Sequence, residues 1–439
     1  MKRYRIWKAL VMILMTAVLA GALPVPARAE TEVRTVSPVS VNSSRTLNVL
    51  FIGNSFSMDT TAYLYDIAKQ TGGRICLGVG WIRGAKLPAH AGNALSDAQK
   101  YMYDENTAGR WETKKYNKSS VWRLSWIMKR KKWDVIVLQV YSTDIGNMAA
   151  FYPEGDQTKP CYLEDLARYC KKKCPGAHVA YNMSWALPEG SDGRGFDQYS
   201  GQMDMCRAAW DTTRRLLLEL TEETEEEGGE GADLTGKEVV EGITESSSLV
   251  VKTTPARAPS VEFVIPTGTA VQNARSSYFG DTLHRDNKHL SYGLGRYIAA
   301  MATAASLGCP VEKISSFKLS EKASTLHLPV IKASVRDALE NPFSLTEESR
   351  ELPVLARVNA RAGRKSSKVT CSWTPVAGAT GYKIRYKTGG SSSYKTVTVG
   401  PSSTFFQFTG KRGKNRIRIY ALGDRYIPES EVRKKTVKF

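Results

Sequence analysis

The chain has 439 residues, of which 42% are hydrophobic and 24% are charged. This length indicates two to three domains, and this composition excludes both a wholly disordered chain and a membrane protein with many spans. A formal net charge of +19 ordinarily favours a nucleic acid or an anionic surface as a partner. Where the basic residues lie along the chain decides between these partners.

The first 29 residues have the pattern of a secretory signal peptide. Four basic residues precede an apolar run from residue 9 to about residue 23, and the small-residue motif ARA follows at 27–29. An uncleaved membrane anchor is the alternative, but the run is short for a spanning helix and two prolines interrupt its end. We therefore expect cleavage after Ala29 and a secreted, extracellular protein with no transmembrane segment, with association with the cell wall left open.

Residues 47–268 contain five short apolar runs, each compact enough for a buried strand. They are LNVLFIG (47–53), RICLGVG (74–80), DVIVLQV (134–140), HVAYNMSW (178–185) and VEFVIPTG (261–268). Segments of helical length separate them, among them 57–72, which has helical periodicity. Near-continuous apolar strands are typical of a parallel sheet that is covered on both faces. The predicted fold class is therefore α/β: a three-layer α/β/α sandwich with a five-stranded parallel sheet, whose sites lie at the carboxyl ends of the strands.

Two changes in composition mark the domain boundaries. Residues 219–245 hold eleven acidic residues against one lysine, and such a run buries too little apolar area to fold, so we expect a disordered acidic insertion over 219–258. Beyond Pro353, short alternating strands separated by glycine turns predict an all-β sandwich. The predicted organisation is a signal peptide at 1–29, a linker at 30–45, an α/β domain at 46–348 and a β-sandwich at 352–439.

Two motifs carry candidate catalytic residues. Ser55 follows the first predicted strand directly, in GNSFS (53–57), where a turn exposes the hydroxyl at the sheet edge and helix amides favour negative charge. Far along the chain, in LHRDNKHLS (283–291), Asp286 precedes His289 by three residues, just before a predicted helix at 293–306. A histidine can accept the serine proton while a carboxylate orients its ring. We therefore predict a catalytic triad, although a helix cap and a surface histidine are the structural alternatives.

These motifs resemble those of the SGNH, or GDSL-like, hydrolase superfamily. Gly53-Asn54-Ser55 matches its first block, with Asn54 in place of the aspartate, and the D-x-x-H string that ends at His289 matches its last block. The strings FIGNSFSMD and LHRDNKHLSYGLGRYIAA resemble a branch known chiefly as a domain of unknown function in secreted bacterial proteins. The resemblance covers about 47–307 and implies a three-layer α/β/α fold and ester hydrolysis through an acyl-enzyme, often deacetylation of carbohydrates.

The resemblance also implies an oxyanion hole and a substrate pocket. We expect the oxyanion donors to be Ser55, Gly84, with Gly80 as the alternative, and Gln139. The usual G-x-N-D block is absent after the third strand, where the chain has LQVYS, and Gln139 carries an amide that could replace the missing asparagine. The expected substrate contacts are Tyr141, Trp185 and Gln272, which follow the third, fourth and fifth predicted strands, and His90. For His90, a core or surface position is the alternative.

Neither a metal nor a cofactor is predicted. The seven cysteines are scattered and lack the paired spacing of a zinc site or a dense disulfide framework. The glycine-rich GVGWIRG at 78–84 departs by one residue from the dinucleotide-binding pattern. A serine mechanism needs no cofactor.

The C-terminal domain resembles a fibronectin type III module, on Trp373, on ATGY at 379–382 and on the strand IRIYA at 417–421. Residues 352–439 hold 19 lysines and arginines against three acidic residues, whereas the rest of the mature chain is close to neutral. Because an exported protein does not ordinarily meet nucleic acid, we expect an anionic cell-envelope polymer or acidic polysaccharide as its partner. A basic face that is merely solvated is the alternative.

The predicted function is that of a secreted serine esterase that removes acyl groups, above all acetyl groups, from a carbohydrate or glycoconjugate. A lipid or small-ester hydrolase is the first alternative, against which stands the lack of a conspicuous apolar lid segment. A non-catalytic cell-surface or glycan-binding protein is the second, because the third block of the superfamily is nonstandard.

Overall fold

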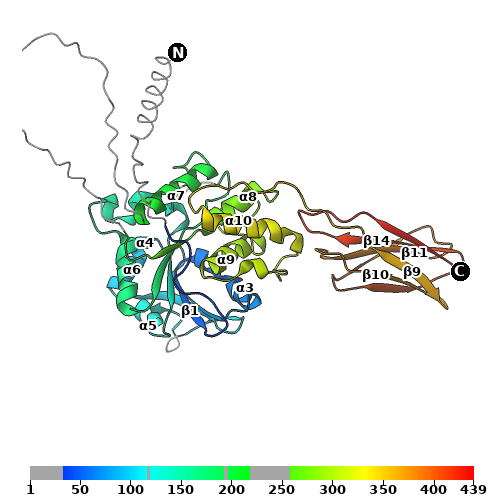
Figure 1. Cartoon of the computed structure of the whole chain (residues 1–439), viewed down its shortest axis with the longest axis horizontal. Coiled ribbons are helices and arrows are strands. Elements are labelled where there is room, and N and C mark those ends of the chain that lie inside the picture. The colour runs from blue at the N-terminus through cyan, green and yellow to red at the C-terminus, as the bar shows by residue number, and fades with distance from the viewer. Residues whose placement is uncertain (1–32, 116–118, 192–195, 218–257) are drawn as a thin grey trace, which may run out of the picture. The chain divides into compact units, whose positions relative to one another are not determined.

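The computed structural model describes residues 33–115, 119–191, 196–217 and 258–439. The expected signal peptide and nearly all of the acidic insertion lie outside these residues. A central sheet has the strand order β4-β3-β2-β1-β6-β7-β8, with β5 paired to β3 (Figure 1). Five of its strands run parallel to one another: β1 (Leu47–Gly53), β2 (Ile75–Trp81), β6 (Val135–Gln139), β7 (His178–Asn182) and β8 (Phe263–Ile265). The prediction of a mixed α/β domain with a mostly parallel sheet is confirmed.

The prediction of only five strands is wrong, because three antiparallel strands extend the sheet beyond β2. They are β3 (Gln99–Asn106), β4 (Trp111–Thr113) and β5 (Trp122–Arg123). The sequence of β3, QKYMYDEN, does not have the apolar character of a buried strand. Its acidic residues are nevertheless buried, since Asp104 accepts a hydrogen bond of 2.6 Å from the Trp81 indole and Glu105 lies 2.8 Å from the Lys131 ammonium.

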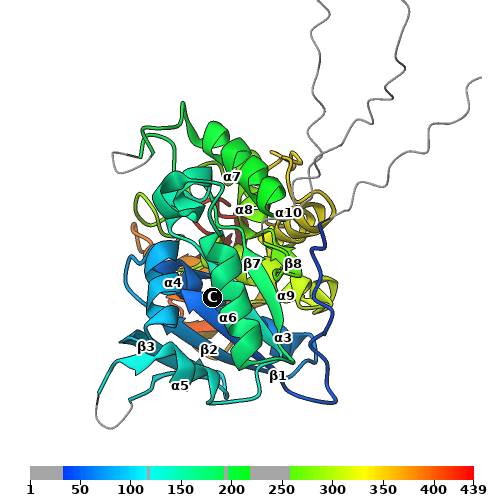
Figure 2. The same cartoon turned by 90° about the vertical axis from the view of Figure 1, so that its left-hand side faces the viewer.

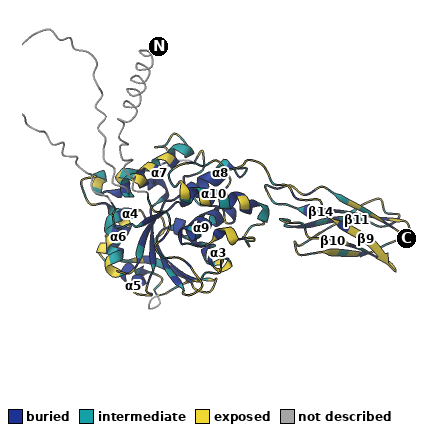
Figure 3. Cartoon of the chain, viewed as in Figure 1, coloured by how far each residue is buried: buried dark blue, intermediate teal, exposed yellow. Residues whose placement is uncertain are grey.

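Helices pack on both faces of the sheet, and the strands supply both cores. In β1, Val49 and Phe51 join one hydrophobic cluster and Leu50 and Ile52 join the other, as the alternation of side chains along a strand requires. The first cluster is covered by α2 (Ser55–Thr61), α3 (Leu64–Gln70), α8 (Thr267–Ser276), α9 (Leu294–Ser306) and α10 (Leu328–Glu340). The second is covered by α4 (Leu87–Leu95), α5 (Leu124–Met128), α6 (Tyr162–Lys173) and α7 (Gln202–Leu217). Figure 2 shows α6 in front of the sheet, and Figure 3 shows buried strands between helices with exposed outer faces.

Shorter elements complete the domain. The helix expected over 57–72 is two helices, α2 and α3, which are separated at residues 62–63. Short 3-10 helices lie at Ser142–Asp144, Met148–Phe151, Pro153–Gly155, Val311–Lys313 and Thr325–His327. The described part of the expected linker packs on the domain, because the amides of Ser37 and Val41 donate to the carbonyls of Ser306 and Leu307, both at 2.8 Å.

The C-terminal domain consists of two antiparallel sheets. One has the order β13-β10-β9 and the other β12-β11-β14-β15. Their bounds are β9 (Ala360–Lys365), β10 (Lys368–Trp373), β11 (Gly381–Lys387), β12 (Lys395–Val399), β13 (Phe405–Thr409), β14 (Lys414–Leu422) and β15 (Arg433–Lys438). Trp373 and Tyr382 are buried in the core with ring centroids 5.2 Å apart. The expected all-β domain is therefore present.

Two further observations concern the described residues as a whole. No helix among them is long and apolar enough to cross a membrane. All seven cysteines lie in the described part of the chain; each is a free thiol, and Cys174 is the one that is not buried.

Candidate active site

Ser55 begins α2 at the carboxyl end of β1, and Asn54 fixes the turn between them. The Asn54 side chain accepts a hydrogen bond of 3.0 Å from the amide of Phe56, which caps the helix. Its amide nitrogen donates to the carbonyls of Ala85, at 3.2 Å, and Val140, at 3.4 Å. Asn54 therefore joins the segments that follow β1, β2 and β6, and Ser55 lies where the three meet.

The three residues of the predicted triad are brought together. The Ser55 hydroxyl oxygen lies 2.8 Å from Nε2 of His289. Nδ1 of His289 lies 3.0 Å from Oδ2 and 3.1 Å from Oδ1 of Asp286. The His289 and Asp286 side chains are 25% and 49% exposed, so a substrate can reach the site from solvent. A hydroxyl, an imidazole and a carboxylate in this order can activate a serine nucleophile.

Asp286 is held in its charged form by its own loop. One of its carboxylate oxygens accepts the amide protons of His289, at 2.7 Å, and Lys288, at 2.9 Å. Partial burial alone would raise the pKa of Asp286, but these two amides and the neighbouring imidazole outweigh it and hold the pKa below its ordinary value. The carboxylate therefore remains available to orient His289 and to stabilise its protonated form.

Asp59 attaches the loop that carries Asp286 and His289 to the helix that carries Ser55. Its carboxylate is fully buried and accepts bonds from Arg285, at 3.0 Å, and from Arg296, at 2.6 Å. It also accepts the amide proton of Leu290, the residue after the histidine, at 3.0 Å. Sequence reasoning missed this role, although Asp59 ends the string FIGNSFSMD, because its partners lie more than 220 residues away.

Trp185 supports the same loop from the end of β7. It is fully buried, stacks on Phe56 with ring centroids 4.4 Å apart, and donates its indole proton to the carbonyl of Lys288 at 2.9 Å. Phe56 in turn meets the ring of His289 edge-on at 5.6 Å. Trp185, an expected substrate contact, therefore packs on Phe56 and bonds the residue before the histidine.

The predicted oxyanion donors differ in their surroundings. The backbone amides of Ser55 and Gly84 have no hydrogen-bond acceptor among the residues that the structure describes. Gly84 has a φ of +62°, and a side chain there would extend toward the Tyr141 ring. By contrast, the Gln139 amide is buried and engaged, since it accepts from Ser57 at 2.8 Å and donates to Ser184 at 2.9 Å.

Gly80, the alternative candidate for the oxyanion hole, lies inside β2 and faces Ile127.

Two of the predicted substrate contacts are core residues. His90 has no exposed surface and bonds the Tyr101 hydroxyl at 3.0 Å, and burial lowers the pKa of His90 to about 4. Gln272, 7% exposed, bonds Gln202 at 3.2 Å within a buried polar network. The helices α4 and α8 turn both side chains inward, and for His90 this is the core position that the sequence left as the alternative.

Tyr141 remains at the edge of the site, with two lysines beside it. Its hydroxyl accepts a bond of 3.2 Å from Lys288, and the ammonium groups of Lys288 and Lys86 lie 5.6 and 5.7 Å from its ring centroid. Lys86 is also paired with Asp144 at 2.9 Å. The side of the site that Tyr141 forms is therefore polar and cationic, whereas the aromatic ring of Phe56 lies against His289. In the described residues, no group of three or more His, Cys, Asp or Glu side chains is arranged to hold a metal ion.

The comparisons with known proteins place this site in a family. The family described as "Domain of unknown function (DUF4886)" matches residues 48–216 and 226–338. The crystal structure of a DUF4886 family protein from Bacteroides uniformis ATCC 8492 is similar over 69% of this chain and 98% of its own, with 25% identity and a TM-score of 0.54. No curated protein matches the chain.

Fibronectin type III domains are among the solved structures that match the C-terminal region of the chain. A two-domain segment from chicken tenascin matches 20% of this chain and 51% of its own, with 20% identity and a TM-score of 0.18. A fibronectin type III domain of human collagen XX matches 20% of this chain and 98% of its own, with 15% identity and a TM-score of 0.17.

Proposed function

The chain belongs to the DUF4886 family, whose name assigns no activity, and we propose from the site itself that it is a serine ester hydrolase of SGNH type. The observation that carries this proposal is the hydrogen-bonded series Ser55, His289, Asp286, with 2.8 Å from hydroxyl to imidazole and 3.0 Å from imidazole to carboxylate. These are the separations at which a base can take the proton of a nucleophile.

The proposed reaction has two halves. As the Ser55 oxygen attacks the ester carbonyl carbon, Nε2 of His289 takes the hydroxyl proton, and Asp286 stabilises the resulting imidazolium. The amides of Ser55 and Gly84 are the proposed donors to the oxyanion of the tetrahedral intermediate. When that intermediate collapses, the alcohol leaves with the proton from His289 and the acyl group stays on Ser55. A water molecule then attacks the acyl-enzyme in the same way and releases the acid.

We further propose that the alcohol half of the substrate is a sugar and that the acyl group is small, above all acetyl. Tyr141, Lys86 and Lys288 form a polar cluster that begins at the neighbour of His289 in the chain, and such groups favour a hydroxylated substrate over a lipid chain. The pattern of residues 1–29, which lie outside the described residues, leads us to propose an extracellular substrate.

The experiment compares triad variants with matched controls on chromogenic acetyl esters and acetylated glycans. Ser55→Ala and His289→Ala should each lower kcat by about a thousandfold or more, and Asp286→Asn should leave weak activity. The control for His289 is His178→Ala, because His178 pairs with Glu262 at 2.6 Å at the start of β7, the opposite edge of the sheet. The control for Ser55 is the exposed Ser344→Ala. Turnover that persists in Ser55→Ala, or a loss in His178→Ala as large as in His289→Ala, would contradict the proposal.

A further inference from the structure

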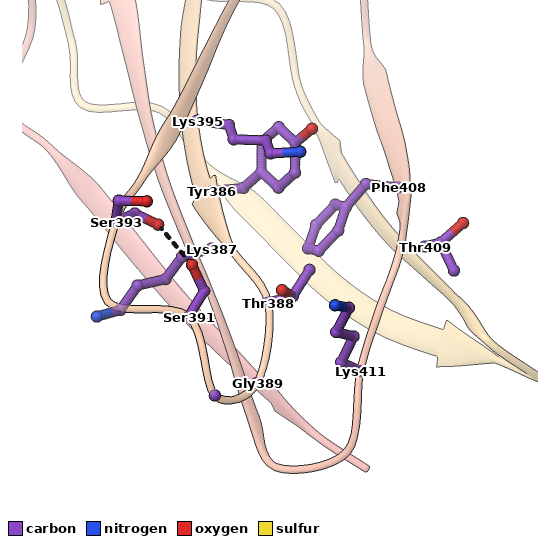
Figure 4. Close-up of a pocket in the computed structure, with 11 residues that line it drawn as sticks. Tyr386, Lys387, Thr388, Gly389, Ser391, Ser393, Lys395, Phe408, Thr409 and Lys411 are labelled. Atoms are coloured by element: carbon purple, nitrogen blue, oxygen red, sulfur yellow. Dashed lines mark hydrogen bonds between the residues drawn. The ribbon is translucent and has the colours of Figure 1, made fainter.

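A cavity lies in the C-terminal domain between two of its turns. It has a volume of about 740 Å³, within the usual range for small-ligand sites. The end of β11 and the turn after it, the start of β12, the end of β13 and the turn before β14 supply its walls. Figure 4 shows Tyr386 and Phe408 side by side in it, with Lys395 drawn across the Tyr386 ring and Lys411 below the two rings in this view.

The two turns are fixed in place before any ligand binds. The Asn415 side chain is fully buried, accepts the amide protons of Gly389, at 3.1 Å, and Lys411, at 3.0 Å, and donates to the Lys411 carbonyl at 2.7 Å. A Cβ on Gly389 would lie 2.0 Å from the carbonyl oxygen of Arg412, so only glycine permits this contact between the turns. A cavity that is already formed spares a ligand the entropy cost of ordering its walls.

The lining carries positive charge that the protein itself does not neutralise. Lys387, Lys395 and Lys411 line the cavity and form no ion pair within the described part of the chain. The domain has three acidic residues at 424, 429 and 431, and none of them lines the cavity. The uncompensated ammonium groups therefore favour an anionic ligand.

The other lining groups indicate which kind of anion fits. Thr388, Ser391 and Thr409 also line the cavity and carry hydroxyl groups. The Ser391 hydroxyl donates to the Ser393 carbonyl at 3.1 Å and that of Thr409 accepts from Lys368 at 3.0 Å. The rings of Tyr386 and Phe408 are tilted by 36° with centroids 4.4 Å apart, so they contact each other and leave no slot for a flat base between them. Phe408 belongs to the buried core of the domain, whereas Tyr386 is half-buried. The exposed part of the Tyr386 ring can pack on the apolar face of a sugar ring, whose hydroxyls and carboxylate then meet polar and cationic groups.

We infer that this cavity binds an acidic saccharide, a sugar unit that carries a carboxylate within a polysaccharide. The inference does not depend on the proposed esterase activity, because it rests on residues of the C-terminal domain alone. A chain in which Ser55 is replaced by alanine should bind as the wild type does.

The test titrates the full chain with polygalacturonate at low ionic strength, by calorimetry, with dextran as the neutral polymer and single-stranded DNA and polyphosphate as other anions. Polygalacturonate should bind and dextran should not. The double variant Lys395→Ala/Lys411→Ala should weaken polygalacturonate binding about tenfold or more, because each lysine makes charge-assisted hydrogen bonds. The control Arg361→Ala/Lys434→Ala removes the same charge from residues that do not line the cavity, and should change affinity by less than about twofold.

Three results would overturn the inference. The first is no binding of polygalacturonate. The second is an equal loss of affinity in both double variants, which would assign binding to the general basicity of the domain. The third is tighter binding of DNA or polyphosphate that the cavity substitutions weaken, which would assign the cavity to a phosphate polyanion and not to an acidic saccharide.

Discussion

Replacement of Asp59 by asparagine tests how the candidate active site is held together. Asparagine keeps the shape of the side chain but removes the negative charge that faces Arg285 and Arg296. Loss of one partner from a buried ion pair costs about 3–5 kcal/mol. Asp59 is fully buried, but the two arginine side chains are 19% and 21% exposed, so water can partly solvate them after the substitution. We therefore expect a loss near the lower end, about 3 kcal/mol in the free energy of unfolding.

That loss should be visible in both stability and catalysis. By the usual scaling for domains of this size, it lowers Tm by about 6–12 °C. The amide of Leu290 also loses the charge of its acceptor, so the loop that carries His289 shifts or becomes more mobile. Small misplacements of a catalytic base have large effects on rate, and we expect kcat for ester hydrolysis to fall by about ten- to a hundredfold below the temperature of unfolding.

The assay pairs urea unfolding with hydrolysis of a chromogenic ester, and Asp66→Asn is the control. Asp66 lies on the neighbouring helix α3, is exposed, and undergoes the same chemical change. An unfolding free energy of Asp59→Asn within about 0.5 kcal/mol of the wild type would refute the assignment of Asp59 as the anchor of the loop. A stability loss with unchanged kcat would show that Asp59 supports the fold but does not position His289.

Three further predictions concern other residues. Trp185→Phe keeps the stacking but loses the bond to the Lys288 carbonyl, so it should cost about 1 kcal/mol of stability and lower kcat; an unchanged kcat would show that the indole does not position the histidine. Burial, together with the charge of Asp337, raises the pKa of Glu348 to about 7 from 4.5. As pH rises through this interval the unfolded state releases the proton first, which lowers stability, so Glu348→Gln should gain stability relative to wild type toward pH 7, and a difference independent of pH would contradict this. Asn415→Ala removes the bonds that join two turns and should cost about 2 kcal/mol or more in the C-terminal domain, measured by its urea midpoint against the exposed control Lys434→Ala.

The sequence was sufficient to predict the parallel strands, because their apolar runs are continuous and end where polar loops begin. The sequence was not sufficient to predict β3, because Asp104 and Glu105 give this strand the polarity of an exposed segment. These carboxylates are buried only because Trp81 and Lys131 reach them from other elements, and no local pattern encodes such partners.

In the candidate active site, too, some residues could be predicted from the sequence and others could not. Ser55 and the Asp286 to His289 motif could be identified because each has a local signature beside a predicted strand or helix. The residues that support the triad could not be identified from the sequence. Asp59 has the local pattern of an ordinary helical residue, and its role is evident only from its ion pairs with Arg285 and Arg296 in the structure. The sequence suggests pocket positions for His90 and Gln272 because each follows a predicted strand. Which way a helix turns its side chains depends on packing, however, and sequence spacing alone does not determine that packing.

Covalent labelling of Ser55 tests the central proposal most directly. The folded chain is treated with a fluorophosphonate, which reacts with serines activated by a neighbouring base, and the modified peptide is identified by mass spectrometry. The proposal predicts one adduct, on Ser55, which is lost in His289→Ala and retained in His178→Ala. Absence of an adduct from the folded wild-type protein, or an adduct on Ser57 in place of Ser55, would contradict the assignment of Ser55 as the nucleophile.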